Sequence, residues 1–363
     1  MKGGGEERDI TSTKDCYMYQ LTTPARRPRA VGSSHSDSAI HAAAMTSLNS
    51  HDAPTALALS TDAQLIFTRT DAGRTEWIFL NFELRATEDK GLGAFALARH
   101  ETGERIFSER PLAMLVVPDR ERVKRGEGVD MINHVVASLN TWRAAAYNSL
   151  SQEVRHGAKE SPVGIWMSNA YPMGSIAGGG DRQGVFEQIC RINHACNPNV
   201  AVTWNSSRRR QTVHALRRIE PGEELTVSFF GSDGRDGMVR HARQEHFIEK
   251  FAFSCGCDLC KLTGEPLARS ESRQRRLMAI RESMEASPRA PYTRLKKLTL
   301  EAMALLHEEG LPRTWAQRWM IRLVSSAADA GKADAAGDWA RQAAACAKDA
   351  CGVDSDEYLS IAQ

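Results

Sequence analysis

The sequence predicts an α+β protein in which a β-rich region is followed by an all-helical C-terminal region. Short apolar runs of strand length, separated by turn residues, recur over residues 61–230, whereas helical apolar spacing dominates residues 263–363. Three cysteines within six residues lie between the two regions. The composition, 42% hydrophobic and 25% charged, supplies enough apolar material for a buried core.

The first 60 residues differ from the rest of the chain. They are rich in Gly, Ser, Thr, Ala and Arg without sustained periodicity, which predicts a mostly disordered leader over residues 1–60. Residues 1–9 contain three acidic side chains and no apolar core, so they do not resemble a secretory signal. No window reaches the roughly 18 apolar residues needed to span a bilayer. We therefore expect an intracellular protein without membrane association, in a compartment where disulfides are rare.

The β-rich region, residues 61–230, is expected to contain nine short strands and two glycine turns. The turns fall at 90–93 and 220–222, and a helical insert is expected at about 128–180, with residues 172–184 as a Gly-rich loop. One helical face of the insert is apolar and consists of Ile132, Val135, Val136, Leu139, Trp142 and Ala146. The expected strands are 65–67, 77–80, 82–86, 94–97, 104–107, 112–117, 200–204, 212–216 and 224–229.

Residues 231–262 are expected to form a separate segment that is helical until the cysteines, and residues 263–363 a helical domain. Breaks near Gly310 and Gly331 predict helical hairpins. The basic runs 208–210 and 273–276 are expected to be solvated faces. A formal net charge of +2 gives no reason to expect direct nucleic-acid binding.

The cysteine cluster predicts a metal site. Cys255, Cys257 and Cys260 place three thiols within reach of one ion, and Gly256 lets the backbone fold around it. Structural zinc sites are closed and four-coordinate, so a fourth ligand is required; the alternative is three thiols that merely cluster. The upstream candidates are Cys196 and Cys190, with His194 and His246 behind them. The cysteines expected to be unliganded are Cys16, Cys346 and Cys351.

The most informative stretch is residues 191–199, Arg-Ile-Asn-His-Ala-Cys-Asn-Pro-Asn. Adjacent Asn193 and His194 precede a cysteine and a proline that prevents helix continuation, so the segment is expected to form a rigid polar bend. It resembles the Asn-His-Ser-Cys-x-Pro-Asn signature of SET-domain protein lysine methyltransferases. Three further motifs agree in order: the glycine turn at 90–95, the closing motif at 221–228 and a post-SET Cys-x-Cys-x-x-Cys segment.

Together these motifs cover residues 82–262. The helical tail looks like that of the SMYD-like branch common in fungi. No cysteine lies between Cys16 and Cys190, so the MYND zinc finger of some relatives is expected to be absent.

The resemblance implies a β-rich SET fold with a pseudoknot, S-adenosylmethionine as cofactor, a structural zinc ion, and a nuclear or cytoplasmic protein acting on a lysine of a histone or another protein. Cys190 is then expected to be a core residue. The helical region is expected either to bind a protein partner or only to form one side of the substrate groove. The implied zinc ligands are Cys196, Cys255, Cys257 and Cys260. The implied cofactor-binding residues are Lys90, Gly91, Leu92, Gly93, Asn193, His194 and Phe253.

One position departs from the family pattern. Phe229 stands where the family has a tyrosine whose hydroxyl aligns the incoming lysine amine, and Phe251, at a second channel position, also lacks a hydroxyl. Tyr147 and Tyr171 lie in the insert, and no tyrosine lies between Tyr171 and Tyr292. A lost transition-state hydrogen bond costs about 2–4 kcal/mol, or two to three orders of magnitude in rate. The resemblance thus implies a weakened methyltransferase, with an inactive scaffold or regulator, or a fold reused for a small molecule, as alternatives.

Overall fold

The computed structural model describes residues 64–69, 75–88, 90–117, 127–151, 161–175, 181–230 and 238–362. The predicted leader lies outside these residues. An antiparallel hairpin, β1 (Gln64–Arg69) with β2 (Thr75–Leu80), belongs to a unit separate from that of residues 81–362. Both hairpin strands coincide with expected ones.

The β-rich part of the main unit consists of small sheets. Strands β3 (Phe82–Ala86) and β4 (Leu92–Ala96) pair antiparallel. A three-stranded sheet has the order β10 (Val200–Asn205), β11 (Arg210–Ala215), β5 (Arg105–Glu109), and another has the order β6 (Ala113–Val117), β8 (Asp181–Val185), β7 (Tyr171–Ser175). Two short strands, β9 (Asn193–His194) and β12 (Thr226–Val227), pair parallel, so the expected strand at 224–229 is shorter than predicted.

The described residues of the insert form three helices: α3 (Glu127–Ala137), α4 (Thr141–Asn148) and α5 (Pro162–Asn169). Ile132, from the predicted apolar face, is buried, but Trp142 is 46% exposed, so the predicted face was one residue too wide. The predicted loop at 172–184 was wrong at both ends, where β7 and β8 pair antiparallel. A side chain at Gly184 would approach the sulfur of buried Met173 to 2.5 Å, so this glycine serves close strand packing rather than a loop.

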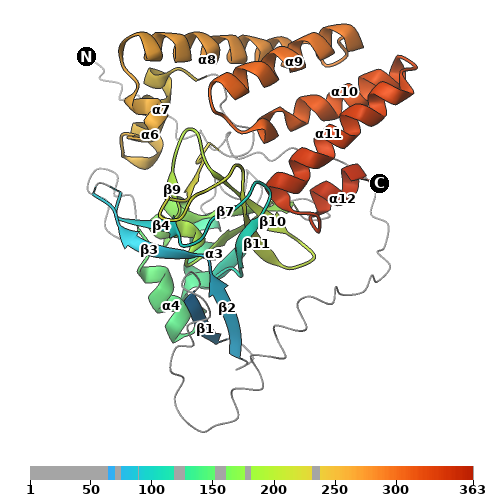
Figure 1. Cartoon of the computed structure of the whole chain (residues 1–363). Helices are drawn as coiled ribbons and strands as arrows, with labels where there is room; N and C mark the ends of the chain where they lie inside the picture. Colours follow the sequence, from blue (N-terminus) through green and yellow to red (C-terminus); the bar gives the residue numbers. More distant parts are fainter. Residues whose placement is uncertain are drawn as a thin grey trace, which may run out of the picture. The chain divides into compact units, whose positions relative to one another are not determined.

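The chain ends in a helical region (Figure 1). Consecutive long helices pack on one another from α8 to α12, and α11 also packs on β10 and β11. The predicted class, a β-rich domain followed by helices, is confirmed. None of the helices in the described ranges is long and apolar enough to cross a membrane. The helices are α6 (Arg240–Phe251), α7 (Asp258–Lys261), α8 (Gly264–Glu285), α9 (Tyr292–Glu308), α10 (Gln317–Asp329), α11 (Ala333–Cys351) and α12 (Asp356–Ala362), with 3-10 turns η1 (Ile189–Arg191) and η2 (Arg313–Ala316).

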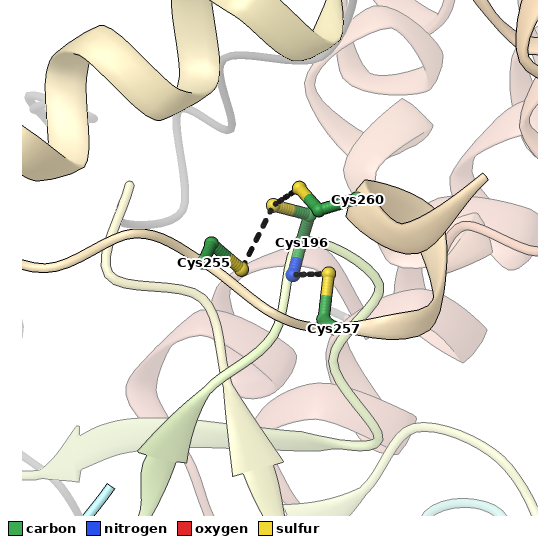
Figure 2. Close-up of side chains that lie close together, drawn as sticks. All are labelled: Cys196, Cys255, Cys257 and Cys260. Carbon is green, nitrogen blue, oxygen red and sulfur yellow. Dashed lines mark hydrogen bonds between the residues drawn. The ribbon is translucent and has the colours of Figure 1, made fainter. Parts of the chain in front are cut away.

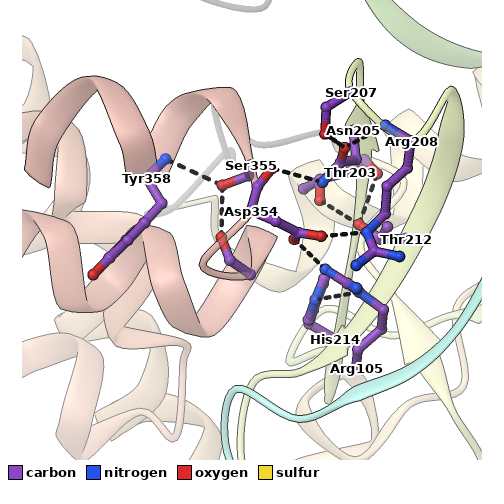
Figure 3. Close-up of polar contacts among 11 residues, drawn as sticks. Arg105, Thr203, Asn205, Ser207, Arg208, Thr212, His214, Asp354, Ser355 and Tyr358 are labelled. Atoms are coloured by element: carbon purple, nitrogen blue, oxygen red, sulfur yellow. Dashed lines mark hydrogen bonds and ion pairs between the residues drawn. The ribbon is translucent and has the colours of Figure 1, made fainter. Parts of the chain in front are cut away.

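Asp354, between α11 and α12, joins the helical region to the sheet (Figure 3). Its carboxylate forms ion pairs with Arg105 of β5 and Arg208 of the β10–β11 turn, and its carbonyl accepts a 3.1 Å hydrogen bond from Asn205. Arg208 is exposed, as expected of a solvated basic face, although it also forms this ion pair. The expectation of a solvated basic face was wrong for Arg273, whose side chain is 24% exposed and pairs at 2.6 Å with the fully buried carboxylate of Glu309.

Candidate functional site

The four predicted zinc ligands meet in one place (Figure 2). Cys196 follows β9, whereas Cys255, Cys257 and Cys260 lie in the loop after α6 and in α7. All four side chains are buried, and their sulfur atoms lie within 4.8 Å of one another. The Sγ of Cys196 is 3.9 Å from that of Cys255 and 3.6 Å from that of Cys260. The structure thus selects Cys196, rather than Cys190, as the fourth cysteine of the cluster.

The local backbone brings these thiols together. Helix α6 ends at Ala252, which has a left-handed conformation with φ 54° and turns the chain toward the cluster. The side chain of Gln244 then fixes the loop, because its Nε2 donates to the carbonyl of Cys255 (2.7 Å) and its Oε1 accepts from the same residue's N–H (2.9 Å). Beyond it, the carbonyl of Cys257 accepts from the N–H groups of Cys260 and Lys261, both at 2.9 Å.

The donor set fits a tetrahedral zinc ion. With Zn–S bonds of about 2.3 Å, the sulfurs of a tetrahedron lie about 3.8 Å apart, close to the two distances from Cys196. Cys190 lies elsewhere and donates to the carbonyl of Asn169 at 3.2 Å. The cluster could therefore hold zinc.

Asn193 joins three segments that are distant in sequence. In β9 it pairs with Thr226 of β12, and its amide nitrogen donates to the carbonyl of Leu92 (3.2 Å) and to Oε1 of Glu224 (2.8 Å). The 3-10 turn η1 that leads into β9 is held by Glu109, whose carboxylate accepts from three successive backbone N–H groups at 2.7–3.2 Å. Burial nevertheless raises the pKa of Glu109 to about 7.

The glycine turn reaches the same point. Gly91 has φ 71°, a conformation that glycine adopts without strain, and a side chain there would meet only open space. A Cβ on Gly93 would lie 2.9 Å from Glu224 and 3.0 Å from the amide of Asn193. The ammonium group of Lys90 forms an ion pair with Oε2 of Glu224 at 2.8 Å. Glycine at position 93 is therefore required for close approach, and the turn remains exposed next to Asn193.

His194 is directed into the protein. Its Nδ1 accepts the N–H of Phe229 at 3.1 Å, so the proton of the neutral ring lies on Nε2, 3.4 Å from the sulfur of Cys196. Burial lowers the pKa of His194 to about 3, which keeps the ring neutral. The imidazole therefore connects the closing strand to the cysteine cluster, and only its backbone is left to face a ligand.

An aromatic cluster surrounds this histidine. The ring centroids of Phe229 and Phe251 lie 5.4 Å apart, and those of His194 and Phe229 lie 5.3 Å apart. Phe253 stacks at 5.2 Å on Phe247, which is fully buried at the centre of the cluster. The predicted channel and cofactor aromatics are thus neighbours, and each of the three is half-buried.

The insert tyrosines serve other contacts. Tyr147 is fully buried in the core of the insert, and its hydroxyl donates to the carbonyl of Pro162 at 2.7 Å. Tyr171 lies in β7 with its ring edge against Phe186. Among the ring contacts of the described residues, neither tyrosine touches Phe229.

Sequence reasoning missed three residues that organise the site. Phe247 could have been found from its spacing, since Arg243, Phe247 and Phe251 recur every four residues on one face of α6. Glu224 carried no signal beyond its place in the closing motif. Arg243, whose Nη2 lies 3.7 Å from the sulfur of Cys260, carried none. The roles of both depend on partners more than a dozen residues away.

Comparison with known proteins assigns the β-rich region. Residues 91–230 match the SET domain family. The chain is 28% identical over 193 residues to the histone-lysine N-methyltransferase set5 of Schizosaccharomyces pombe, covering 53% of this chain and 54% of that protein. It is 30% identical over 78 residues to human histone-lysine N-methyltransferase SMYD3 (22% and 17% covered) and 33% over 76 residues to human protein-lysine N-trimethyltransferase SMYD5 (21% and 18%). The chain thus spans about half the length of the yeast relative and less than a fifth of these two human ones.

Proposed function

We propose that this chain, which carries a SET domain, is an S-adenosylmethionine-dependent protein-lysine methyltransferase whose catalysis is weakened at Phe229. The main support is the junction at Glu224, where the glycine turn, the Asn193 segment and the closing motif meet. Three motifs that are distant in sequence would have no reason to converge on one exposed turn if they served only the core. The names of the relatives support a lysine on a histone or another protein as substrate, and a nuclear or cytoplasmic location.

The cofactor supplies an activated methyl group. Backbone groups of Lys90, Gly91, Leu92 and Gly93 would hold its methionine end, because the open space beside Gly91 permits close approach. Asn193, the backbone of His194 and the ring of Phe253 would hold the adenosine. The buried state of the imidazole supports backbone contacts rather than ring contacts at His194.

The part of the aromatic cluster formed by Phe229 and Phe251 would receive the lysine side chain. Phe229 and Phe251 exclude water from an amine that must arrive neutral, but they offer no hydroxyl to align it. Methyl transfer depends strongly on how the lysine amine is placed relative to the methyl group. The missing hydroxyl would therefore impair the positioning of the amine, and the reaction would be slow. The same absence favours the second candidate function, a SET-type scaffold or regulator that binds the cofactor or a protein partner without transferring the methyl group.

The zinc site would complete one side of the proposed cofactor site. A closed tetrahedral zinc held by Cys196, Cys255, Cys257 and Cys260 supplies a structural cross-link. Because Phe253 precedes Cys255 by two residues and His194 precedes Cys196 by two, this cross-link would fix the cofactor segment beside the aromatic cluster.

The substitution Phe229→Tyr tests the proposal. It restores a hydroxyl at nearly constant ring volume, so transfer of a labelled methyl group from S-adenosylmethionine to mixed histones should rise by up to about 10²–10³-fold. The matched control is Phe230→Tyr, which places the same hydroxyl one residue away on a buried ring; it should lower the melting temperature without raising activity. If Phe229→Tyr lowers the melting temperature and gains no activity, the lysine-methyltransferase proposal fails and the scaffold remains.

A further inference from the structure

Arg243 of α6 is a buried cation without an ordinary counter-charge. The residue is only 4% exposed, and none of the carboxylates in the described ranges forms an ion pair with it. Its Nη1 donates to the carbonyl of Met238 at 2.5 Å, whereas its Nε has no hydrogen-bond partner there. Arginine is almost never fully buried unless it is paired, because an isolated ion is costly to remove from water.

The nearest groups that can carry negative charge are the cysteine thiols. The Nη2 of Arg243 lies 3.7 Å from the sulfur of Cys260. Arg243 and Cys196 also line the same small void, of about 10 Å³, roughly the space of one water molecule. Thiolates bound to a metal would supply, next to the guanidinium, the negative charge that no carboxylate of the described residues supplies.

With zinc bound, the cysteine cluster would carry a net negative charge. Four thiolates and one Zn²⁺ carry a net charge of about −2, which is itself costly in a buried site. The remaining walls of the void are mainly apolar, and they are Phe230, Leu259, Gln274, Leu311 and Trp315. With little water to screen the charges, attraction between the guanidinium and the cluster is strong.

We propose that Arg243 is a positioning residue that offsets the negative charge of a zinc–tetrathiolate centre and thereby strengthens metal binding. The inference rests on the zinc site proposed above. It adds to that site a charge partner from the helix that also carries Phe247 and Phe251. Groups that hydrogen-bond to metal ligands commonly change metal affinity by 10–100-fold when they are mutated.

The test measures zinc retention by the full-length protein during titration with a chromogenic chelator. Arg243→Met removes the charge at similar length and should weaken zinc binding by at least about tenfold, whereas Arg243→Lys should retain most of the affinity. The control is Arg322→Met. Within the described part of the chain, Arg322 donates only to the backbone carbonyls of Met284, Ser287 and Pro288, so zinc affinity should be unchanged.

A second measurement separates charge compensation from simple structural support. Arg243→Met should lower the melting temperature of the zinc-loaded protein more than that of the zinc-stripped protein, in which the negatively charged zinc–tetrathiolate centre is absent. Equal destabilisation of both forms, or unchanged zinc retention, would overturn the role of Arg243. If Arg243→Met does not fold, Arg243→Lys is compared with Cys196→Ser. Retention of zinc by Arg243→Lys supports the role of Arg243, and loss of zinc as complete as in Cys196→Ser overturns that role. Wild-type protein without bound metal would overturn the zinc site and this inference together.

Discussion

A single carboxylate, that of Glu224, connects the two segments expected to hold the cofactor. One oxygen binds the ammonium group of Lys90 in the glycine turn, and the other accepts the amide N–H of Asn193. The Glu224 side chain is 19% exposed, so the ion pair is only partly screened by water. Loss of this bridge should loosen the exposed turn while the buried core of the domain stays intact.

We therefore expect Glu224→Gln to weaken binding of S-adenosylmethionine about fivefold, the equivalent of about 1 kcal/mol, since the amide can still accept from Asn193 but cannot pair with Lys90. Isothermal titration calorimetry measures the change. Glu220→Gln is the control, because Glu220 also forms ion pairs, with Arg99 and Arg218, but at an exposed position. Equal affinities of the wild-type and Glu224→Gln proteins would show that the bridge does not organise the site.

The site could be predicted from sequence only where a residue type is required by its own backbone or chemistry. Gly93 and the clustered cysteines meet that condition, because close packing demands a glycine and a metal demands thiolates. Glu224 and Arg243 do not, since carboxylates and guanidinium groups are common on any surface. Their importance arises from partners that only the tertiary fold brings near them.

At the scale of elements, the strands were easier to predict than the contacts between the helices and the sheet. The hairpin of β10 and β11 could be placed from its alternating apolar residues and polar turn, whereas β7 and β8 were hidden by glycines, of which Gly184 serves close strand packing. The docking of the α11–α12 loop on the sheet was missed because nothing in the sequence pairs Arg208 with Asp354, a residue far along the chain. Gly352 is needed there, since a Cβ would lie 2.8 Å from both Arg105 and His214.

The Asp354 junction should make this docking sensitive to acid. Burial alone would raise the pKa of Asp354, but hydrogen bonds from Arg208 and Arg105 outweigh it and lower the pKa below 3.8. The ionised carboxylate thus stabilises the fold fully above about pH 4, and this contribution is lost as the pH falls through the folded-state pKa.

Asp354→Asn should accordingly reduce the free energy of unfolding by about 1–2 kcal/mol at neutral pH, and the difference from wild type should shrink below about pH 3.8. Urea denaturation at a series of pH values measures it. Asp338→Asn, which removes an exposed pair with Arg341, is the control and should change stability little. A difference that stays constant down to pH 2.5 would contradict the assigned ion pairs.

At the scale of the whole molecule, the fold class followed from the change in apolar periodicity, and the cysteine spacing indicated where the two regions meet. The structure adds that the four cysteines belong to the same core cluster as Phe247 and the buried residues of α8 to α11. The cysteine cluster is therefore continuous with the core of the helical region as well as adjacent to the Asn193 segment. Periodicity could not reveal this continuity, because it reports the buried face of an element but not the element it faces.

Zinc removal should consequently affect the SET domain and the helices together. Elemental analysis should find one Zn²⁺ per chain, and chelation should reduce the free energy of unfolding by at least about 3 kcal/mol, since a metal bound well above its dissociation constant adds its binding free energy to folding. Cys196→Ser should lose both the metal and this stability, whereas Cys190→Ser, at a thiol outside the cluster, should keep the metal. Because the cluster shares a core with the helices, melting followed at the helical circular dichroism signal should shift together with loss of cofactor binding. A Cys196→Ser variant with unchanged metal content and melting temperature would remove the zinc assignment and the cross-link that it provides.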